Sequence, residues 1–247
     1  MLSFKRFHVL SEGGNIKVGD VSANDIKITS KNRGDVAGDI HSALIAMHDS
    51  FNKTTGKNIF GKNAKALTAG SAFAGSTHHL MDKSISHSEF AKYKPSVGDM
   101  DIKVDKQHAE DFASHLKPGS KFGKYTVVGT KKGSATHHVL MRHDDGSVHQ
   151  FDMMHSDYHK DEPSEFEKFS HSSNWNDVKS GIKGLHHKVL LNAVGGEKHK
   201  FSTMYGLGSR TDEKAPWIND KTKIAHTLFG SKAEPSKLDS FHGVADL

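Results

Sequence analysis

The sequence contains no cysteine among its 247 residues. Disulfide bonds, thiolate metal sites and cysteine nucleophiles are therefore excluded, and their absence is typical of proteins from a reducing cytoplasm. No apolar run approaches the length of about 18 residues that a membrane-spanning helix needs. The N-terminal segment also lacks a long apolar stretch followed by a small-residue cleavage site, so we expect no signal peptide. These absences predict a cytoplasmic protein that does not interact with membranes.

Charge of one sign is not concentrated in any block of the sequence. The formal net charge is +5 with histidine counted as neutral, which favours polyanionic partners such as nucleotides or nucleic acid. Basic residues are not interleaved with aromatic ones, so a nucleic-acid groove and a merely solvated basic surface both stay open. The 20 histidines include no His-Glu-x-x-His motif, which argues against a zinc protease.

Hydrophobic periodicity and turn residues predict an α+β protein with a mixed β-sheet flanked by helices. The expected helices cover residues 32–51, 77–82, 87–93, 107–116, 162–171, 174–194 and 221–229. The expected strands cover residues 7–10, 25–29, 67–72, 98–105, 125–131, 135–143, 147–154 and 200–205. We assign residues 1–160 to a core with N-terminal strands and a helix, and residues 161–247 to a mainly helical C-terminal region. Its tail, from residue 231, is expected to be flexible.

Two aspartates on one expected strand are the first sign of a functional site. Asp99 and Asp101 are two residues apart, so their side chains project from the same face of a strand. The alternating residues Met100, Ile102 and Val104 then take the opposite, buried face. Neighbouring carboxylates repel each other unless a cation lies between them. Mg²⁺ fits this arrangement, because it binds one or two carboxylates together with water and phosphate oxygens.

A third carboxylate, Asp152, lies near the end of the expected strand 147–154. The Asp144-Asp145-Gly146 sequence before that strand is a strong hairpin signal, which explains its two aspartates as turn residues. Asp152 has no comparable structural role, and an unpaired carboxylate in an apolar strand would be costly. We therefore place Asp152 in the same metal site as the first two aspartates. His155, three residues later, is a further residue that could line this pocket.

Two glycine–serine steps precede the aspartate pair, at Gly70-Ser71 and at Gly75-Ser76. Glycine permits a tight turn with close backbone approach, and the N-terminus of a following helix offers free N–H groups to phosphate. Gly75 and Ser76 are favoured because a helix-compatible segment follows them at once. A turn glycine followed by a helix-capping serine explains the same pattern structurally.

This order of features resembles the nucleotidyltransferase superfamily of polymerase-beta type. The motifs GSTHHLM, at 75–81, and KYKPSVGDMDIKV, at 92–104, are similar to those of nucleotidyltransferase-domain proteins of tailed bacteriophages. The resemblance covers residues 60–155. It implies a nucleotidyltransferase-like core in which Asp99, Asp101 and Asp152 hold two Mg²⁺ or Mn²⁺ ions.

The resemblance also implies the reaction. Gly75 and Ser76 would bind a nucleoside triphosphate, and Lys183, expected on the helix 174–194, would reach the same phosphates. The nucleoside monophosphate would move to an acceptor hydroxyl on an RNA 3′ end, a protein or a small molecule, with release of pyrophosphate. A phage-encoded enzyme of this kind would act in the host cytoplasm, with a host protein as one acceptor. Its oligomeric state is not predicted.

Two functions from other classes stay open at this stage. The first is a catalytically silent nucleotidyltransferase fold that acts as an interaction module, although three intact carboxylates argue against it. The second is a histidine-rich metal-binding protein or phosphohydrolase, which would need histidine pairs, rather than the three aspartates, as ligands. Metal titration of a variant with all three aspartates changed to alanine would separate this second function from the enzyme.

Overall fold

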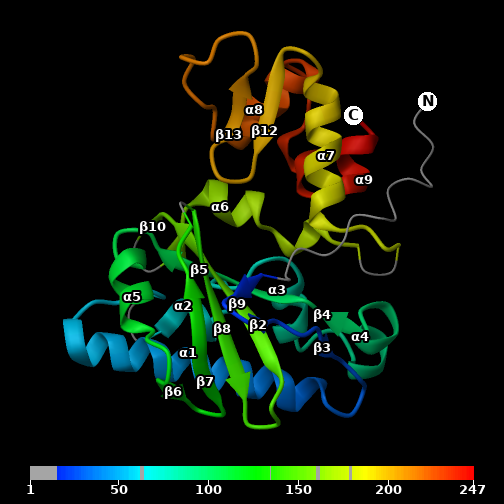
Figure 1. Ribbon diagram of the computed structural model, residues 1–247. Coiled ribbons are helices and arrows are strands. Elements are labelled where there is room, and N and C mark those ends of the chain that lie inside the picture. The colour runs from blue at the N-terminus through cyan, green and yellow to red at the C-terminus, as the bar shows by residue number, and fades with distance from the viewer. Residues whose placement is uncertain (1–15, 62–63, 134, 160–161, 178–179) are drawn as a thin grey trace.

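The computed structural model describes residues 16–61, 64–133, 135–159, 162–177 and 180–247, and it is a mixed α+β protein (Figure 1). Its helices are α1 (Arg33–Thr55), α2 (Lys65–Thr68), α3 (Gly75–Met81), α4 (His87–Tyr93), α5 (Ala109–His115), α6 (Glu165–Ser170), η3 (Ser173–Trp175), α7 (Gly184–Gly195), α8 (Lys221–Phe229), η4 (Pro235–Asp239) and α9 (Phe241–Ala245).

Within the described residues, the strands form one five-stranded sheet and four short two-stranded pairs. The strands are β1 (Lys17–Val18), β2 (Val21–Ser22), β3 (Ile26–Lys27), β4 (Ser96–Val97), β5 (Asp99–Asp105), β6 (Lys121–Phe122), β7 (Tyr125–Lys131), β8 (Thr136–His143), β9 (Val148–Ser156), β10 (Tyr158–His159), β11 (Glu162–Pro163), β12 (His199–Ser202) and β13 (Gly206–Ser209). The expected strand 7–10 lies outside the described residues.

The five-stranded sheet has the order β5-β9-β8-β7-β6. Strand β5 runs parallel to β9, and every other neighbouring pair in this sheet is antiparallel. The hairpin between β8 and β9 confirms the turn predicted from Asp-Gly, because Gly146 has a φ of 91° and the amide of His143 donates to the carbonyl of Ser147. This topology places β5 and β9, the two strands that carry the three predicted aspartates, side by side.

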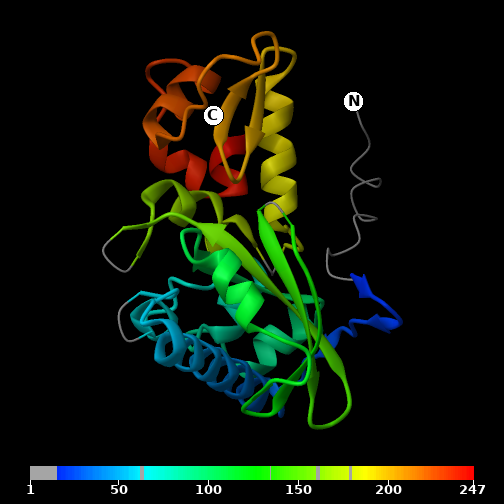
Figure 2. The same cartoon turned by 60° about the vertical axis from the view of Figure 1, so that its left-hand side comes forward.

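Helix α1 covers one face of the sheet, as Figure 2 shows. The predicted stripe is confirmed, since Ile40, Leu44, Met47 and Phe51 are completely buried in the main hydrophobic core. The helix continues to Thr55, four residues beyond the predicted end, and Gly56 then ends it in the left-handed conformation.

The first strand predicted for the central sheet, residues 67–72, is wrong. The chain there forms the short helix α2, which buries Ala66 and Leu67, followed by a turn. A segment this short, with only a few apolar residues, fits a buried strand or one helical turn equally well, so its periodicity could not decide between them. Only Phe73 pairs with the sheet, through an antiparallel bridge to Ile102 of β5.

A second hydrophobic core lies in the C-terminal part of the chain, where α7, α8, α9 and η4 surround the β12–β13 hairpin (Figure 1). The helix predicted over 174–194 is interrupted: η3 ends at Trp175, Gly181 has a φ of +69°, and α7 begins only at Gly184. The predicted flexible tail is also wrong, because it forms η4 and α9 and buries Leu238 and Val244 in this core.

Helix α8 has the predicted bounds and an N-cap whose removal can be measured. The side chain of Asp220 accepts a hydrogen bond from the amide of Lys223 at 2.8 Å. We expect Asp220→Ala to lower the free energy of unfolding by about 1 kcal/mol, because a helix N–H loses its partner. Urea unfolding followed by the fluorescence of Trp175 and Trp217 would measure this change.

Asp212→Ala is the matched control, because this exposed aspartate accepts the amide of Lys214 outside any helix. An equal loss in both variants would contradict a capping role for Asp220.

Within the described ranges, no helix is both long enough and apolar enough to cross a membrane.

Candidate metal and phosphate site

Strand β5 presents Asp99 and Asp101 on one face of the sheet, as their spacing predicts. Met100, Ile102 and Val104 alternate with them and are completely buried on the face that packs against the main core. The aspartates therefore lie on the opposite face from α1. This alternation is the reason that the strand keeps its register, since a shift by one residue would bury both carboxylates in the apolar core.

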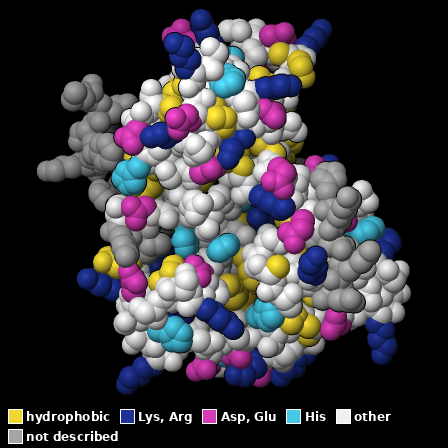
Figure 3. Space-filling model, turned by 180° about the vertical axis from the view of Figure 1, so that it is seen from behind, with side chains coloured by type: hydrophobic (Ala, Val, Ile, Leu, Met, Phe, Trp, Pro, Cys, Tyr) yellow, Lys and Arg dark blue, Asp and Glu magenta, His cyan; other side chains and the backbone are white. Residues whose placement is uncertain are grey.

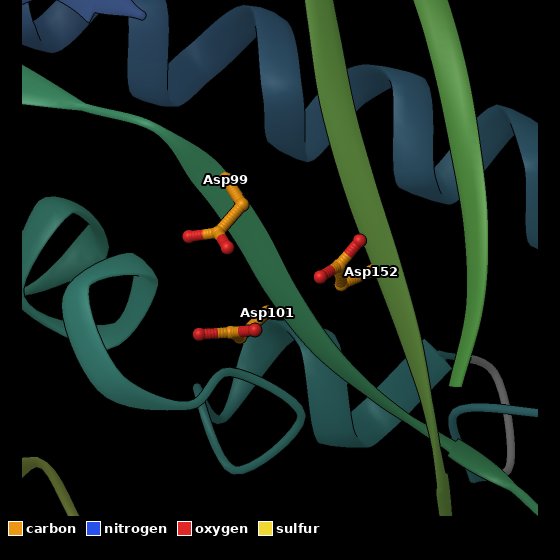
Figure 4. Close-up of side chains that lie close together, drawn as sticks. All are labelled: Asp99, Asp101 and Asp152. Carbon is orange, nitrogen blue, oxygen red and sulfur yellow. The ribbon is translucent and has the colours of Figure 1, made fainter. Parts of the chain in front are cut away.

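Strand β9 brings the third carboxylate to the same place. In the parallel register, Asp152 lies directly opposite Asp101, and Figure 4 shows the three labelled side chains on the same side of the two strands. One ligand oxygen from each of Asp99, Asp101 and Asp152 lies within 4.8 Å of the others. The sequence separates Asp101 from Asp152 by about fifty residues, so only the sheet topology joins them.

The electrostatics of the cluster are unfavourable without a cation. The pKa of Asp101 is raised to about 7, first by burial and then by the neighbouring Asp152 carboxylate, while Lys94 acts in the opposite direction. Asp152 is 8% exposed, and Asp101 keeps partial contact with solvent. The raised pKa of Asp101 indicates that Lys94 alone does not balance the negative charge of the cluster.

The start of α3 lies against the same carboxylates. The amide of Ala74 donates to the carbonyl of Asp101 at 3.1 Å, and the amide of Asp101 donates to the hydroxyl of Thr77 at 2.8 Å. Gly75 has a φ of +49°, and a Cβ at this position would lie 3.3 Å from Oδ2 of Asp101. Glycine is therefore needed here both for the backbone conformation and for close approach to the carboxylate.

Ser76 and Lys183 line one small cavity together with Lys94, Phe90 and Tyr93. The expected position of Lys183 within a helix is wrong, because it is the residue that precedes α7. The segment before α7 nevertheless lies close to the start of α3, so Lys183 and Ser76 line the same cavity. Lys94, at the end of α4, was not predicted, because a lone lysine after a helix carries no signal in sequence.

The alternative Gly70-Ser71 step lies elsewhere. Gly70 lines a larger cavity of about 950 Å³ between α1, α2 and α3, and none of the three clustered carboxylates lines it. The hydroxyl of Ser71 makes a long contact of 3.5 Å to the carbonyl of Ala66. Proximity to the carboxylates therefore favours the step at Gly75, and size alone does not make the larger cavity the reactive one.

Three polar residues next to the carboxylates were missed by sequence analysis. Nδ1 of His138 lies 2.7 Å from Oδ1 of Asp152, and the side-chain amide of Gln150 donates to the same oxygen at 2.8 Å. Thr77 is the third, through its contact with the amide of Asp101. Only the alternation of β9 hinted at any of them, since Gln150 is two residues before Asp152 and shares its face.

His155 does not line the pocket of Asp152. The two are three residues apart on the continuous strand β9, so their side chains lie on opposite faces of the sheet. The ring of His155 packs against that of His137, with centroids 4.3 Å apart. Asp145 is a turn residue as predicted, because it accepts hydrogen bonds from the amide and the hydroxyl of Ser147.

The donor set of the cluster fits Mg²⁺ or Mn²⁺. All three groups offer oxygen, which hard divalent cations prefer, and the raised pKa of Asp101 shows that positive charge would be favourable there. In the described part of the chain, no other group of three histidine or acidic side chains has its ligand atoms this close together. The histidine-rich alternative therefore has no preformed site among these residues.

The chain was also compared with known proteins. No protein-family model, no curated protein and no solved structure matches it.

Proposed function

We propose that this protein is a metal-dependent nucleotidyltransferase. The observation that carries the proposal is the convergence of Asp99, Asp101 and Asp152 from two parallel strands, beside the glycine turn that begins α3. The motifs quoted above support the same function, because they resemble those of polymerase-beta-type nucleotidyltransferases. The sheet of β5 to β9 would then form the nucleotidyltransferase-like core.

In the proposed reaction, an acceptor hydroxyl loses its proton to water and its oxygen bonds to the α-phosphorus of a nucleoside triphosphate. The bond between the α-phosphorus and the oxygen that bridges to the β-phosphate breaks, and pyrophosphate leaves with that oxygen. Divalent cations, when bound, supply activation of the hydroxyl and neutralise charge on the departing pyrophosphate. The three carboxylates orient these cations. Lys94 and Lys183, which line a cavity with Ser76, provide positive charge for the phosphates.

The acceptor is the part of the proposal that experiment must supply. Figure 3 shows lysine and arginine side chains interspersed with acidic ones over the face that it presents, rather than gathered into one wide basic patch. Such a surface suits an RNA 3′ end, a protein side chain or a small molecule. The first assay therefore offers all three classes.

The test is incubation with each α-labelled nucleoside triphosphate, Mg²⁺ or Mn²⁺, and either total RNA or a cell lysate. We expect label to move to an acceptor in the wild-type protein and not in Asp101→Ala. Asp105→Asn is the matched control, because Asp105 lies on the same strand and face but outside the cluster. Absence of both transfer and triphosphate binding with either metal would refute the enzyme and favour the interaction module.

A further inference from the structure

The third carboxylate is held by two side chains that the reaction itself does not require. His138 on β8 lies directly opposite Asp152 in the antiparallel register, so their side chains share a face of the sheet. Its Nδ1 lies 2.7 Å from Oδ1 of Asp152. Gln150 lies two residues before Asp152 on the same face, and its Nε2 donates to the same oxygen at 2.8 Å. Asp101, Asp152 and His138 thus form a row across three neighbouring strands.

The donor atom of each side chain follows from the hydrogen bonds that the side chain makes. Oε1 of Gln150 accepts a hydrogen bond from the amide of Ile16 at 3.1 Å, which leaves its Nε2 to donate to Asp152. An ionised carboxylate only accepts hydrogen bonds, so Nδ1 of His138 must carry the proton in its contact with Asp152. His138 therefore contributes through one particular ring nitrogen.

Both donors reach Oδ1, and this distribution determines how Asp152 can bind a cation. Two hydrogen bonds occupy the lone pairs of that oxygen, whereas no hydrogen bond from a described residue reaches Oδ2. A carboxylate fixed in this way offers one oxygen in a defined direction. Groups that orient metal ligands in this manner commonly change metal affinity by about 10- to 100-fold when they are removed.

We propose that His138 is a positioning residue that holds Asp152 as a one-oxygen ligand, so that the affinity of the cluster for a divalent cation depends on the Nδ1–H donor of His138. This inference rests on the proposed metal-dependent function. In this role His138 does not contact the reacting atoms. It acts only through its hydrogen bond to Asp152. Its side chain is 26% exposed, so substitution leaves the core packing largely intact.

Two substitutions of His138 separate the donor from the bulk of the ring. The amide nitrogen of asparagine can take a position near that of Nδ1, whereas the amide of glutamine reaches farther, near that of Nε2. We expect His138→Asn to bind Mn²⁺ within about threefold of wild type and His138→Gln to bind it about tenfold more weakly. Titration of the metal-free, full-length protein followed by the electron paramagnetic resonance of free Mn²⁺ measures this without nucleotide.

The control is His143→Gln, which makes the same change on the same strand. His143 contacts Asp39 and Asp145, neither of which belongs to the carboxylate cluster, so Mn²⁺ affinity should not change. Gln150→Met is a second test, because it removes the other donor to Oδ1 and should weaken Mn²⁺ binding in the same direction. High Mn²⁺ should restore transfer by His138→Gln, which a folding defect would not allow.

The outcomes distinguish this inference from the proposed function. Equal Mn²⁺ affinity in wild type, His138→Gln and Gln150→Met would overturn the positioning role while leaving the metal site intact. Failure of the wild-type protein to bind Mn²⁺ would overturn both. Weaker binding by His138→Gln together with near-normal binding by His138→Asn would support the role of the single N–H donor.

Discussion

Asp101→Asn is expected to abolish nucleotidyl transfer while leaving the protein folded. The substitution keeps the size of the side chain but removes the charge at the centre of the cluster, where Asp101 faces Asp152 across the strand pair. Divalent cations in such sites contribute several kcal/mol of transition-state stabilisation, so their loss corresponds to a decrease in rate of about a thousandfold or more. Initial rates of label transfer at saturating Mg²⁺ would measure the decrease.

Asp105→Asn again provides the control, because it removes a carboxylate from the same strand face outside the cluster. Its transfer rate should stay within about twofold of wild type, since screened surface charges act weakly at that distance. A rate for Asp101→Asn equal to that of the control would show that the carboxylate cluster is not the catalytic centre. Circular dichroism of the two variants would confirm that they fold alike.

The carboxylate strand could be predicted because its pattern is local. The alternation from Asp99 to Asp105 specifies both the strand and the face of each side chain. The hairpin before β9 specifies where the strand that carries Asp152 begins. Periodicity could not predict that Asp152 lies next to Asp101. It depends on β9 entering the sheet parallel to β5 and in a register set by packing of the whole sheet.

The positioning residues escaped prediction for the same reason. His138 is one of 20 histidines, and its neighbour His137 has the same residue type but lies on the other face, with 1% exposure. Nothing in the local sequence tells these two apart. The register of β8 against β9 places His138, and not His137, opposite Asp152.

The C-terminal errors arise where tertiary contacts overrule local preference. The apolar spacing over 174–194 favours one long helix, but the side chain of Asn176 accepts the amide of Gly184 and the intervening glycine-containing turn separates η3 from α7. Packing of Leu238 and Val244 into the second core likewise orders a tail whose composition alone suggests flexibility. Both features require contacts between segments distant in sequence.

The stability of the metal-free protein is expected to decrease as the pH rises from 5 to 8, because of Asp101. Its pKa is about 7 in the folded protein, above the ordinary value of 3.8 that the unfolded chain restores. Between these values the folded state holds a proton that the unfolded state has released, so raising the pH favours unfolding. Solvent contact at the side chain reduces the effect, and we expect a loss of roughly 2 kcal/mol over this range.

Other groups titrate in the same interval, so the comparison with Asp101→Asn isolates this one. The free energy of unfolding of the variant lacks the Asp101 contribution, and its advantage over wild type should grow from pH 5 to about pH 7 and then level off. Saturating Mn²⁺ at pH 8 should remove most of that advantage, because the cation replaces the proton as the partner of the wild-type carboxylates. Urea unfolding of both proteins at several pH values, with and without Mn²⁺, measures these differences. Parallel curves for the two proteins in the metal-free state would mean that Asp101 is ionised throughout this pH range, and that the cluster tolerates its negative charge without a cation.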